Sequence, residues 1–530
     1  MTMVAFARAD VCIIGAGLAG ALLAHELGRA GWKVTVLDAG PRTDPKDRFA
    51  RMEMHLNEQD PWASELPERD RYTNAGEINF PLDAMRVKAV GGTTHHWGGT
   101  CLRLHESDFR MRSRYGIADD WPITYAELEP YYARAEAALG VAGTADNPYA
   151  SYRSADYPLP PFPFSYANRI FRPRLDRIGV TLHHVPYARN SRPYQGRPAC
   201  QAYGTCHPVC PIEALYNAGV HVRLAEQTGN VRVIPNANVV RLVESGGKVT
   251  EAIYASPDRT EHAQPARLFI LAAHAIESAR LLLLSRSSRF PDGLANDSGL
   301  VGRYFMSHLK LQLVGKLDLR LFPHRIGFHT GETHHFYTTR RRDRIGALKL
   351  EIDDRGATPS QIAVRSGNWG RALADEVRGE FGRHAAILAL IEQLPDRRNA
   401  VTLDPKVTDW FGNPVPRIHF AISDYERETV REATAQIERL LQAIGAREID
   451  LGDETVKFSS HHLGTCRMGD DPAQSVINRH LKAHALENLY VAGSGAFVTG
   501  GAVNPSLTIA ALAIRAAEHI LNSGSTGKTG

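Results

Sequence analysis

The chain has 530 residues, of which 43% are hydrophobic and 23% charged, the composition of an ordinary soluble globular protein with two or three domains. A net charge of +4 spread over this length gives no case for a nucleic-acid or anionic-membrane partner. No run of about eighteen apolar residues predicts a membrane-spanning helix, and six cysteines are too few for a disulfide scaffold. The densest basic run, Arg340–Arg344, is interpreted as a solvated surface segment.

The first elements predict a nucleotide-binding β-turn-α-β unit. Ala9–Ile14 is a short strand-like run, Gly15-Ala16-Gly17-Leu18-Ala19-Gly20 follows it, and a helical pattern leads to a second buried strand at Val34–Leu37. In this spacing Gly15 permits a tight turn, Gly17 lets a pyrophosphate reach the helix N-terminus, and Gly20 lets the helix pack closely on the strand. Asp38 ends the second strand, where it can accept hydrogen bonds from ribose hydroxyls.

The apolar segment Val11–Ala24 superficially resembles a signal peptide because it follows Arg8. The glycine spacing inside it favours a buried strand, turn and helix instead. The chain is therefore expected to carry no export signal of its own.

Later segments predict a second domain inserted into the first. Tyr125–Leu139 is an amphipathic helix capped by Thr124, and residues 142–200 are rich in Pro, Tyr and Arg, which predicts a long surface excursion. Alternating segments between 310 and 450, such as Leu311–Val314 and Ile418–Ile422, predict an antiparallel sheet. The strand Leu489–Ala492 and the helix Ser506–Ile520 return to the nucleotide-binding pattern.

The predicted fold class is therefore α/β with antiparallel β. It comprises a discontinuous Rossmann-type nucleotide-binding domain and a substrate-binding domain built on an antiparallel sheet. The nucleotide-binding domain is assigned residues 1–110, 200–309 and 455–522. Residues 111–199 and 310–454 are assigned to the substrate-binding domain and its surface excursion, and 523–530 to a flexible tail.

Further segments, in the same order along the chain, resemble the glucose-methanol-choline (GMC) oxidoreductases. They are Ala89–Gly99 (AVGGTTHHWGG), Val301–His308, His461–Gly469, and Val491–Gly495 continuing to Asn504–Thr508. The stretch from Ala188 to Ile212 is more narrowly similar to the catalytic subunits of bacterial glucose, gluconate and fructose dehydrogenases. The resemblance covers nearly the whole chain. It implies an FAD enzyme that oxidises a sugar or glycoside hydroxyl by hydride transfer to flavin N5.

The resemblance also implies the flavin-binding residues. Backbone amides of Gly91, Gly92 and Thr93 are expected to meet the FAD pyrophosphate and ribityl chain. His96 matches the position at which some members attach flavin covalently, and packing against the isoalloxazine ring is the alternative. The full expected set is Gly15, Gly17, Gly20, Asp38, Gly91, Gly92, Thr93, His96, Trp97, Gly98, Val239, Gly495 and Ala496.

Alcohol oxidation requires a base for the hydroxyl proton, and histidine suits this role because it is largely neutral near pH 7. By resemblance, His461 matches the base and Asn504 its partner, whose amide can hold the substrate oxygen. The adjacent His462 is the alternative base and is expected to be structural. His334 and His335 are interpreted as part of a surface loop rather than of the sugar site.

Three cysteines lie close together in Cys200-x5-Cys206-x3-Cys210-Pro211, a grouping that suits an iron–sulfur cluster. The resemblance implies a [3Fe–4S] cluster that passes electrons to a haem partner. This chain departs from the pattern in one place, because Gln201 stands where the relatives have a second cysteine. The alternatives are zinc with His207 as a fourth ligand, a disulfide with one thiol left over, or a vestigial loop. Cys12, Cys101 and Cys466 are expected to be packing residues.

The main functional hypothesis is a sugar dehydrogenase subunit. The resemblance adds a small subunit that carries an export signal and a cytochrome c acceptor, so the expected location is the periplasm. The alternatives are a GMC oxidase that uses dioxygen without a cluster, with a cytoplasmic location, and a non-catalytic flavin-binding subunit.

Overall fold

The predicted glycine turn joins β2 to α1 at the carboxyl edge of a mixed sheet. The computed structural model describes residues 4–5, 8–64, 67–322, 329–353, 358–450 and 456–525. In these residues the first sheet has the order β6-β3-β2-β9-β8-β7, with β1 and β18 pairing with β9. Its strands are β1 (Val4–Ala5), β2 (Ala9–Ile14), β3 (Val34–Leu37), β6 (Val231–Ile234), β7 (Asn238–Ser245), β8 (Lys248–Ala255), β9 (Glu261–Leu271) and β18 (Leu489–Val491).

The parallel part of this sheet is β6-β3-β2-β9 with β1 and β18, and β8 and β7 continue it in antiparallel pairing. β2 and β3 are almost wholly apolar and buried, as expected for strands covered on both faces. This arrangement confirms the predicted Rossmann-type unit and places both glycine loops at one edge, where open α/β sheets bind ligands.

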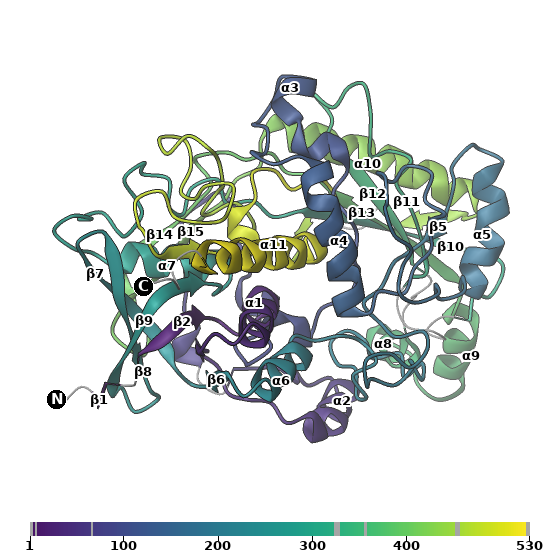
Figure 1. Ribbon diagram of the computed structural model, residues 1–530. Helices are drawn as coiled ribbons and strands as arrows, with labels where there is room; N and C mark the ends of the chain where they lie inside the picture. Colours follow the sequence, from purple (N-terminus) through teal and green to yellow (C-terminus); the bar gives the residue numbers. More distant parts are fainter. Residues whose placement is uncertain are drawn as a thin grey trace.

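Small side chains let the helices around this sheet approach closely. α1 packs against α6 and α11, and α11 packs against α4 (Figure 1). Their bounds are α1 (Leu18–Arg29), α4 (Tyr125–Leu139), α6 (Gly219–Gln227), α7 (Ala275–Leu284) and α11 (Ser506–Ser525). Thr124 and Glu127 form a capping box at the start of α4, which explains the helix boundary predicted there.

The segment after the predicted boundary at residue 110 packs closely on the nucleotide-binding unit. Trp121, Leu128 and Leu139 belong to the same hydrophobic core as β2 and α11. The excursion expected between 142 and 200 contains α5 (Tyr166–Asp176) and β5 (His183–His184), which pack with the second sheet. α11 extends to Ser525, and the remainder of the expected tail, 526–530, lies outside the described residues.

The second sheet has the order β16-β10-β13-β12-β11-β5, and β17 also pairs with β10. α10 (Asp424–Ala443) covers one face, where Leu311, Leu350 and Ile387 lie in a second core (Figure 1). Because side chains alternate along strands, the intervening residues project to the opposite face. The strands are β5, β10 (Leu309–Lys316), β11 (Gly331–Thr333), β12 (Leu348–Asp353), β13 (His384–Ile391), β16 (Glu448–Asp450) and β17 (Lys457–Phe458).

A third, three-stranded sheet contains the second of the predicted antiparallel segments, because β14 (Ala400–Thr408) and β15 (Pro414–His419) pair antiparallel. Ile418 does not join the large antiparallel sheet. It lies in β15, between β14 and β4 (Thr73–Asn74), and shares a core with Ile276 of α7. Alternation alone could not decide which sheet this strand would join.

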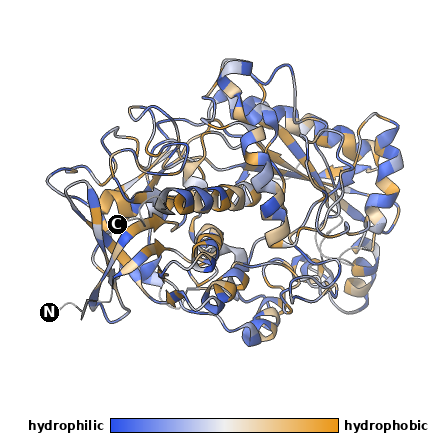
Figure 2. Cartoon of the chain, in the orientation of Figure 1, coloured by the Kyte–Doolittle hydropathy of each residue, from blue (hydrophilic) through white to orange (hydrophobic). Residues whose placement is uncertain are grey.

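The remaining helices are α2 (Arg48–Leu56), α3 (Met111–Tyr115), α8 (Pro359–Arg365) and α9 (Gly370–Glu380). Short 3-10 turns span Pro45–Asp47, Pro67–Arg69, Asp83–Met85, Gly92–His95, Glu106–Phe109 and Ser494–Ala496. Figure 2 shows hydrophobic residues gathered along the strands and mixed colouring on the outer helices. Among the described helices, none has the length and apolar character needed to cross a bilayer.

Candidate active site

A cavity of about 600 Å³ runs along the carboxyl edge of the first sheet and reaches the second sheet. Its size and mixed lining are typical of a site for a large organic cofactor and a small substrate. The first glycine loop, the 91–99 loop and the segments at 460–462 and 504–506 all line it. Lys310, His329, Glu351, Leu388 and Leu390 contribute from the other side.

Gly15, Gly17 and Gly20 have different structural constraints. A Cβ on Gly15 would lie 2.5 Å from the Ala272 carbonyl oxygen, and one on Gly20 would lie 1.9 Å from the Gly15 oxygen. A Cβ on Gly17 would meet nothing within 4 Å, because Gly17 caps α1 at the open cavity. Gly15 and Gly20 therefore close the turn, and Gly17 leaves room for a phosphate group at the helix N-terminus.

The second glycine loop meets the first. The Gly91 amide donates to the Ala16 carbonyl at 3.1 Å, and a Cβ on Gly92 would lie 3.2 Å from the Gly17 Cα. Gly91 and Gly92 both have positive φ values, 108° and 60°, which favour glycine. Gly92, Thr93, His96, Trp97 and Gly98 line the cavity together. The two loops thus form one continuous backbone cradle.

Asp38 lies at the end of β3, as predicted, and lines the cavity. One carboxylate oxygen accepts from the Ala16 amide at 2.8 Å and the other from the Gly40 amide at 2.9 Å. Burial raises the pKa of Asp38, and these amides and the nearby Lys88 and Arg69 oppose that shift. Each oxygen retains a second lone pair, so the carboxylate can also accept a hydroxyl.

Four more residues were expected to contact the flavin, and two of them line the cavity whereas the other two are buried beside it. Val239 lines the cavity, and the half-buried His96 lies beside the second glycine loop. Burial lowers the pKa of His96. The carbonyls of Gly495 and Ala496 accept hydrogen bonds from Cys466 and Met468. Both residues are buried, and the preceding Gly493 and Ser494 line the cavity in their place.

His461 is held by a relay of hydrogen bonds. His308 Nε2 lies 2.9 Å from the Gly501 carbonyl oxygen, which can only accept, so this nitrogen carries a proton. Burial lowers the pKa of His308 to about 4, so its ring is neutral and its Nδ1 accepts. His461 Nδ1 lies 2.8 Å from that nitrogen and therefore donates to it. This leaves His461 Nε2 without a proton, so its lone pair can accept.

Asn504 faces that lone pair. Its Nδ2 lies 3.4 Å from His461 Nε2, and its Oδ1 accepts from Lys349 Nζ at 2.8 Å. Lys349 is fully buried and also donates to Glu351 at 2.7 Å. Because the ammonium can only donate, it orients the Asn504 amide with its N–H groups toward His461. The predicted pair is thus brought together across 43 residues of sequence.

The surroundings keep His461 neutral. Burial is the main cause, and the nearby His308, Lys310 and Lys349 add to it, so the pKa of His461 lies well below the ordinary histidine value. A neutral imidazole beside an amide donor can accept a proton from a hydroxyl whose oxygen the amide holds.

His462 has a different environment. Its Nδ1 lies 2.7 Å from His274 Nε2, and its ring packs against Phe80 and Phe305. It lines the cavity as well, but its contacts are those of a packed residue.

Two interpretations from the sequence are wrong. Arg342, within the basic run expected to be solvated, is fully buried and binds Asp108 and Glu392 at 2.9 and 2.7 Å. His334, expected on a surface loop, is only 2% exposed, and only His335 is exposed. Composition of a short run could not reveal carboxylates contributed from distant parts of the chain.

The cysteine loop packs directly behind the second glycine loop. Cys200, Cys206 and Cys210 form a small cluster with Trp97, which also lines the cavity. Each sulfur accepts a hydrogen bond of 3.4 Å, from Ala202 N, Arg189 Nη1 and Leu215 N respectively. Burial of Arg189 favours its neutral form, but the nearby Cys206 and Cys200 outweigh this effect and raise the pKa of Arg189 above its ordinary value. Donors and a buried cation around three sulfurs fit thiolate ligands of a cluster.

The structure bears on the alternatives for this loop. All three cysteines are free thiols, so none forms a disulfide. Two groups among the described residues bring all their ligand atoms within 4.8 Å of one another, and neither contains a cysteine. The three cysteine sulfurs are thus not among the described groups whose ligand atoms meet closely enough to share one ion. Cys12, Cys101 and Cys466 are buried, as predicted for packing residues.

Comparisons with known proteins agree with this geometry. Residues 10–142 match the family described as FAD dependent oxidoreductase, and residues 395–513 match GMC oxidoreductase. The fructose dehydrogenase large subunit of Gluconobacter japonicus is 33% identical, with 97% of this chain and 98% of that protein covered. The 2-methyl-1,2-propanediol dehydrogenase of Mycolicibacterium austroafricanum is 31% identical over 97% and 95%.

An oxidase is also among the relatives. The 6'''-hydroxyparomomycin C oxidase of Streptomyces lividus is 30% identical, with 96% of this chain and 91% of that protein covered. Among solved structures, pyridoxine 4-oxidase from Mesorbium loti has a TM-score of 0.66 at 18% identity, with 97% and 99% of the two chains covered. This last likeness supports the fold alone.

Proposed function

Since this chain belongs to the GMC oxidoreductase family of FAD enzymes that act on CH–OH groups, we propose that it is a sugar or glycoside dehydrogenase. It oxidises one hydroxyl to a carbonyl and passes electrons through a [3Fe–4S] cluster to a cytochrome. The observation that carries the proposal is the unprotonated Nε2 of His461, which lies 3.4 Å from the Asn504 amide nitrogen at the cavity wall.

Bound FAD supplies the hydride acceptor at its N5 atom. The chain itself manages the proton and the oxygen. His461 Nε2 takes the hydroxyl proton, and the Asn504 amide donates to the same oxygen as negative charge develops there. The His308–Gly501 contact holds the His461 ring, and Lys349 holds the amide. The two glycine loops, with Asp38, are suited to the phosphates and a ribose of the cofactor.

A sugar fits the second sheet's polar face. Lys310, His329 and Glu351 line the cavity on the side of the second sheet, together with Leu388 and Leu390. Charged and polar groups interleaved with apolar ones suit a ligand with many hydroxyls on an apolar ring. Two relatives, the fructose dehydrogenase subunit and the paromomycin-type oxidase, are named for sugar-containing substrates. A panel of sugars and glycosides, followed by product NMR, identifies the carbon oxidised.

The electron exit is assigned to Cys200, Cys206 and Cys210 because they pack against Trp97, which borders the flavin cavity. An anaerobically purified sample should contain about three iron and four sulfide per chain with an EPR signal of a three-iron cluster. Fewer than about one iron per chain would end this part of the proposal. Substitution Cys206→Ser should then abolish cytochrome reduction but leave flavin reduction by substrate intact.

The oxidase reading is the second candidate, because one relative is an oxidase. Hydrogen peroxide formed in step with substrate oxidation supports the oxidase. Rapid reduction of a dye or cytochrome with little peroxide supports the dehydrogenase.

His96 is the residue through which flavin would be attached covalently. After acid precipitation, a yellow pellet supports attachment, and a colourless pellet with all FAD in the supernatant contradicts it.

The proposal includes a small subunit that carries the export signal, a cytochrome c acceptor and a periplasmic location. Its support is the relative named a large subunit, a term that implies a second chain in that enzyme. Co-purification with the products of neighbouring genes, followed by cell fractionation, tests these points. Recovery of active enzyme from the cytoplasm without a partner favours the oxidase alternative.

A further inference from the structure

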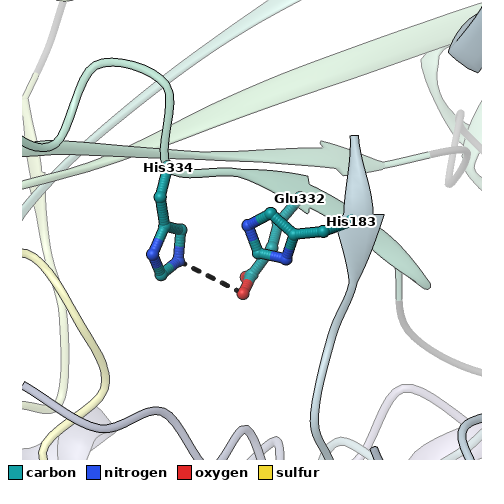
Figure 3. Close-up of side chains that lie close together, drawn as sticks. All are labelled: His183, Glu332 and His334. Atoms are coloured by element: carbon teal, nitrogen blue, oxygen red, sulfur yellow. Dashed lines mark ion pairs between the residues drawn. The ribbon is translucent and has the colours of Figure 1, made fainter. Parts of the chain in front are cut away.

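Three buried ligand-type side chains meet where β5 joins the second sheet, outside the flavin cavity (Figure 3). His183 in β5 lies directly opposite Glu332 in β11 in the antiparallel ladder, so both side chains project to one face. His334 follows two residues after Glu332 and lies on the same face. One ligand atom from each residue lies within 4.8 Å of the other two.

His183 presents a bare nitrogen to this group. Its Nδ1 lies 3.1 Å from the His184 carbonyl oxygen, which can only accept, so the proton is on Nδ1. No hydrogen-bond donor of the described chain reaches its buried Nε2.

Glu332 presents an anionic oxygen to the same point. Its Oε1 lies 3.4 Å from His334 Nε2 and its Oε2 lies 3.3 Å from Lys349 Nζ, but neither contact in the described structure has the geometry of a hydrogen bond. A bare nitrogen and a carboxylate oxygen therefore face each other in a buried site, which is costly unless a cation lies between them.

The local charges leave room for such a cation. Lys349 Nζ lies 3.3 Å from Glu332 Oε2 and 2.7 Å from Glu351 Oε1, so one ammonium serves two carboxylates. It occupies the Oε2 side of Glu332 and leaves the Oε1 side to the histidines. His334 Nδ1 lies 3.1 Å from His105 Nε2 and 3.3 Å from Asn147 Nδ2. An amide nitrogen can only donate, so metal binding at His334 Nε2 requires the Asn147 amide to turn and His334 Nδ1 to donate to His105 instead. Such an outer hydrogen bond orients metal-binding histidines.

We propose that His183 Nε2, Glu332 Oε1 and His334 Nε2 bind one divalent transition-metal ion of the zinc class. Two imidazoles and one carboxylate favour zinc over magnesium or calcium, which prefer oxygen ligands. The ion ties β5 to β11 and holds Glu332, which in turn contacts Lys349 behind the catalytic Asn504. The site goes beyond the flavin chemistry and does not depend on which alcohol is oxidised.

The test uses the purified flavoprotein, dialysed against chelator and then titrated with Co²⁺. Wild type should bind one Co²⁺ with visible d–d absorption and no thiolate-to-cobalt charge-transfer band. His183→Ala should lower the affinity at least about 100-fold, since even outer-shell changes cost 10–100-fold. His184→Ala is the matched control, because that ring pairs with Asp146 at 2.6 Å outside the group, and it should bind like wild type.

Flavin content and melting temperature establish that each variant is folded, and His334→Ala replaces His183→Ala if the latter is not. Equal Co²⁺ affinity in wild type and the folded variant would overturn the proposal. Binding accompanied only by thiolate charge-transfer bands would assign the metal to the cysteine loop and overturn it too. Absence of sugar oxidation would contradict the proposed function but leave this result unchanged.

Discussion

Lys349 is the residue whose removal tests the geometry of the active site most selectively. It does not reach His461, yet its ammonium donates to Asn504 Oδ1 at 2.8 Å and so aims the amide. Lys349→Met keeps much of the volume and removes that donor. The amide then has no fixed orientation, and its oxygen can turn toward the substrate oxygen, where it would repel developing negative charge.

A hydrogen bond to a charged group contributes about 1.5–3 kcal/mol. If this stabilisation is expressed in the transition state, the rate constant for flavin reduction falls about 10- to 150-fold, at about 1.4 kcal/mol per factor of ten. The assay is anaerobic stopped-flow flavin reduction at saturating substrate. FAD content should be unchanged, because Lys349 is not among the residues that line the cavity.

A double-mutant cycle separates positioning from general damage. On an Asn504→Ala background, Lys349→Met should have little further effect, because its influence passes through that amide. Should the variant not fold because Glu332 and Glu351 lose their counter-ion, Lys349→Met/Glu351→Gln removes one charge of each sign. A fall of less than about threefold in a folded, FAD-loaded variant, or equal losses on both backgrounds, refutes the reasoning.

Three other predictions follow from the same structure. Because the pKa of His461 is depressed, its neutral base form persists as the pH falls. The value of kcat/KM should therefore not decline when the pH is lowered through about 6.5. An apparent pKa at or above that value in the kcat/KM profile would contradict this prediction. Gly17→Ala should weaken FAD binding without lowering the apoprotein Tm. Gly20→Ala should destabilise the apoprotein by about 1–3 kcal/mol, because its Cβ would lie 1.9 Å from a carbonyl oxygen. Equal melting temperatures of the two apoproteins would contradict these separate roles of the two glycines. Arg342→Met should lower the free energy of unfolding in urea by about 3–5 kcal/mol, because two buried carboxylates lose their partner. At the exposed Arg344, the change to Met should alter this free energy by no more than about 0.5 kcal/mol. A loss below about 1 kcal/mol for Arg342→Met would contradict the buried pairing.

The nucleotide-binding unit could be predicted because its signals are local. The glycine spacing, the apolar strands and the acid at Asp38 lie within 30 residues of one another, and each has one structural interpretation in that context. His461 and Asn504 were found through motifs whose positions the resemblance supplied, and the structure places their side chains 3.4 Å apart.

The supporting residues could not be predicted in the same way. His308 and Lys349 contact His461 and Asn504 from 153 and 155 residues away. His308 ends one of the recognised segments, which is the only signal that could have pointed to it. Lys349 has the sequence pattern of an ordinary strand lysine, because its burial depends on Glu332 of the neighbouring strand as well as on Glu351 of its own strand.

The sequence also led to a wrong expectation of burial where a residue's partner lies far away along the chain. Arg342 binds Asp108, which lies 234 residues earlier, and so is buried inside an exposed basic run. β5 has only two residues, too few for a strand pattern, yet its pairing with β11 sets His183 against Glu332.

The most direct test of the account measures how fast substrate reduces the flavin of the His461→Ala variant under anaerobic conditions. His462→Ala is the neighbouring control. The account predicts that His461→Ala retains FAD and is reduced by substrate at least about 100-fold more slowly than wild type. His462→Ala should be affected less, because its partners are His274 and aromatic rings. Bleaching of the His461→Ala flavin at the wild-type rate would contradict the account.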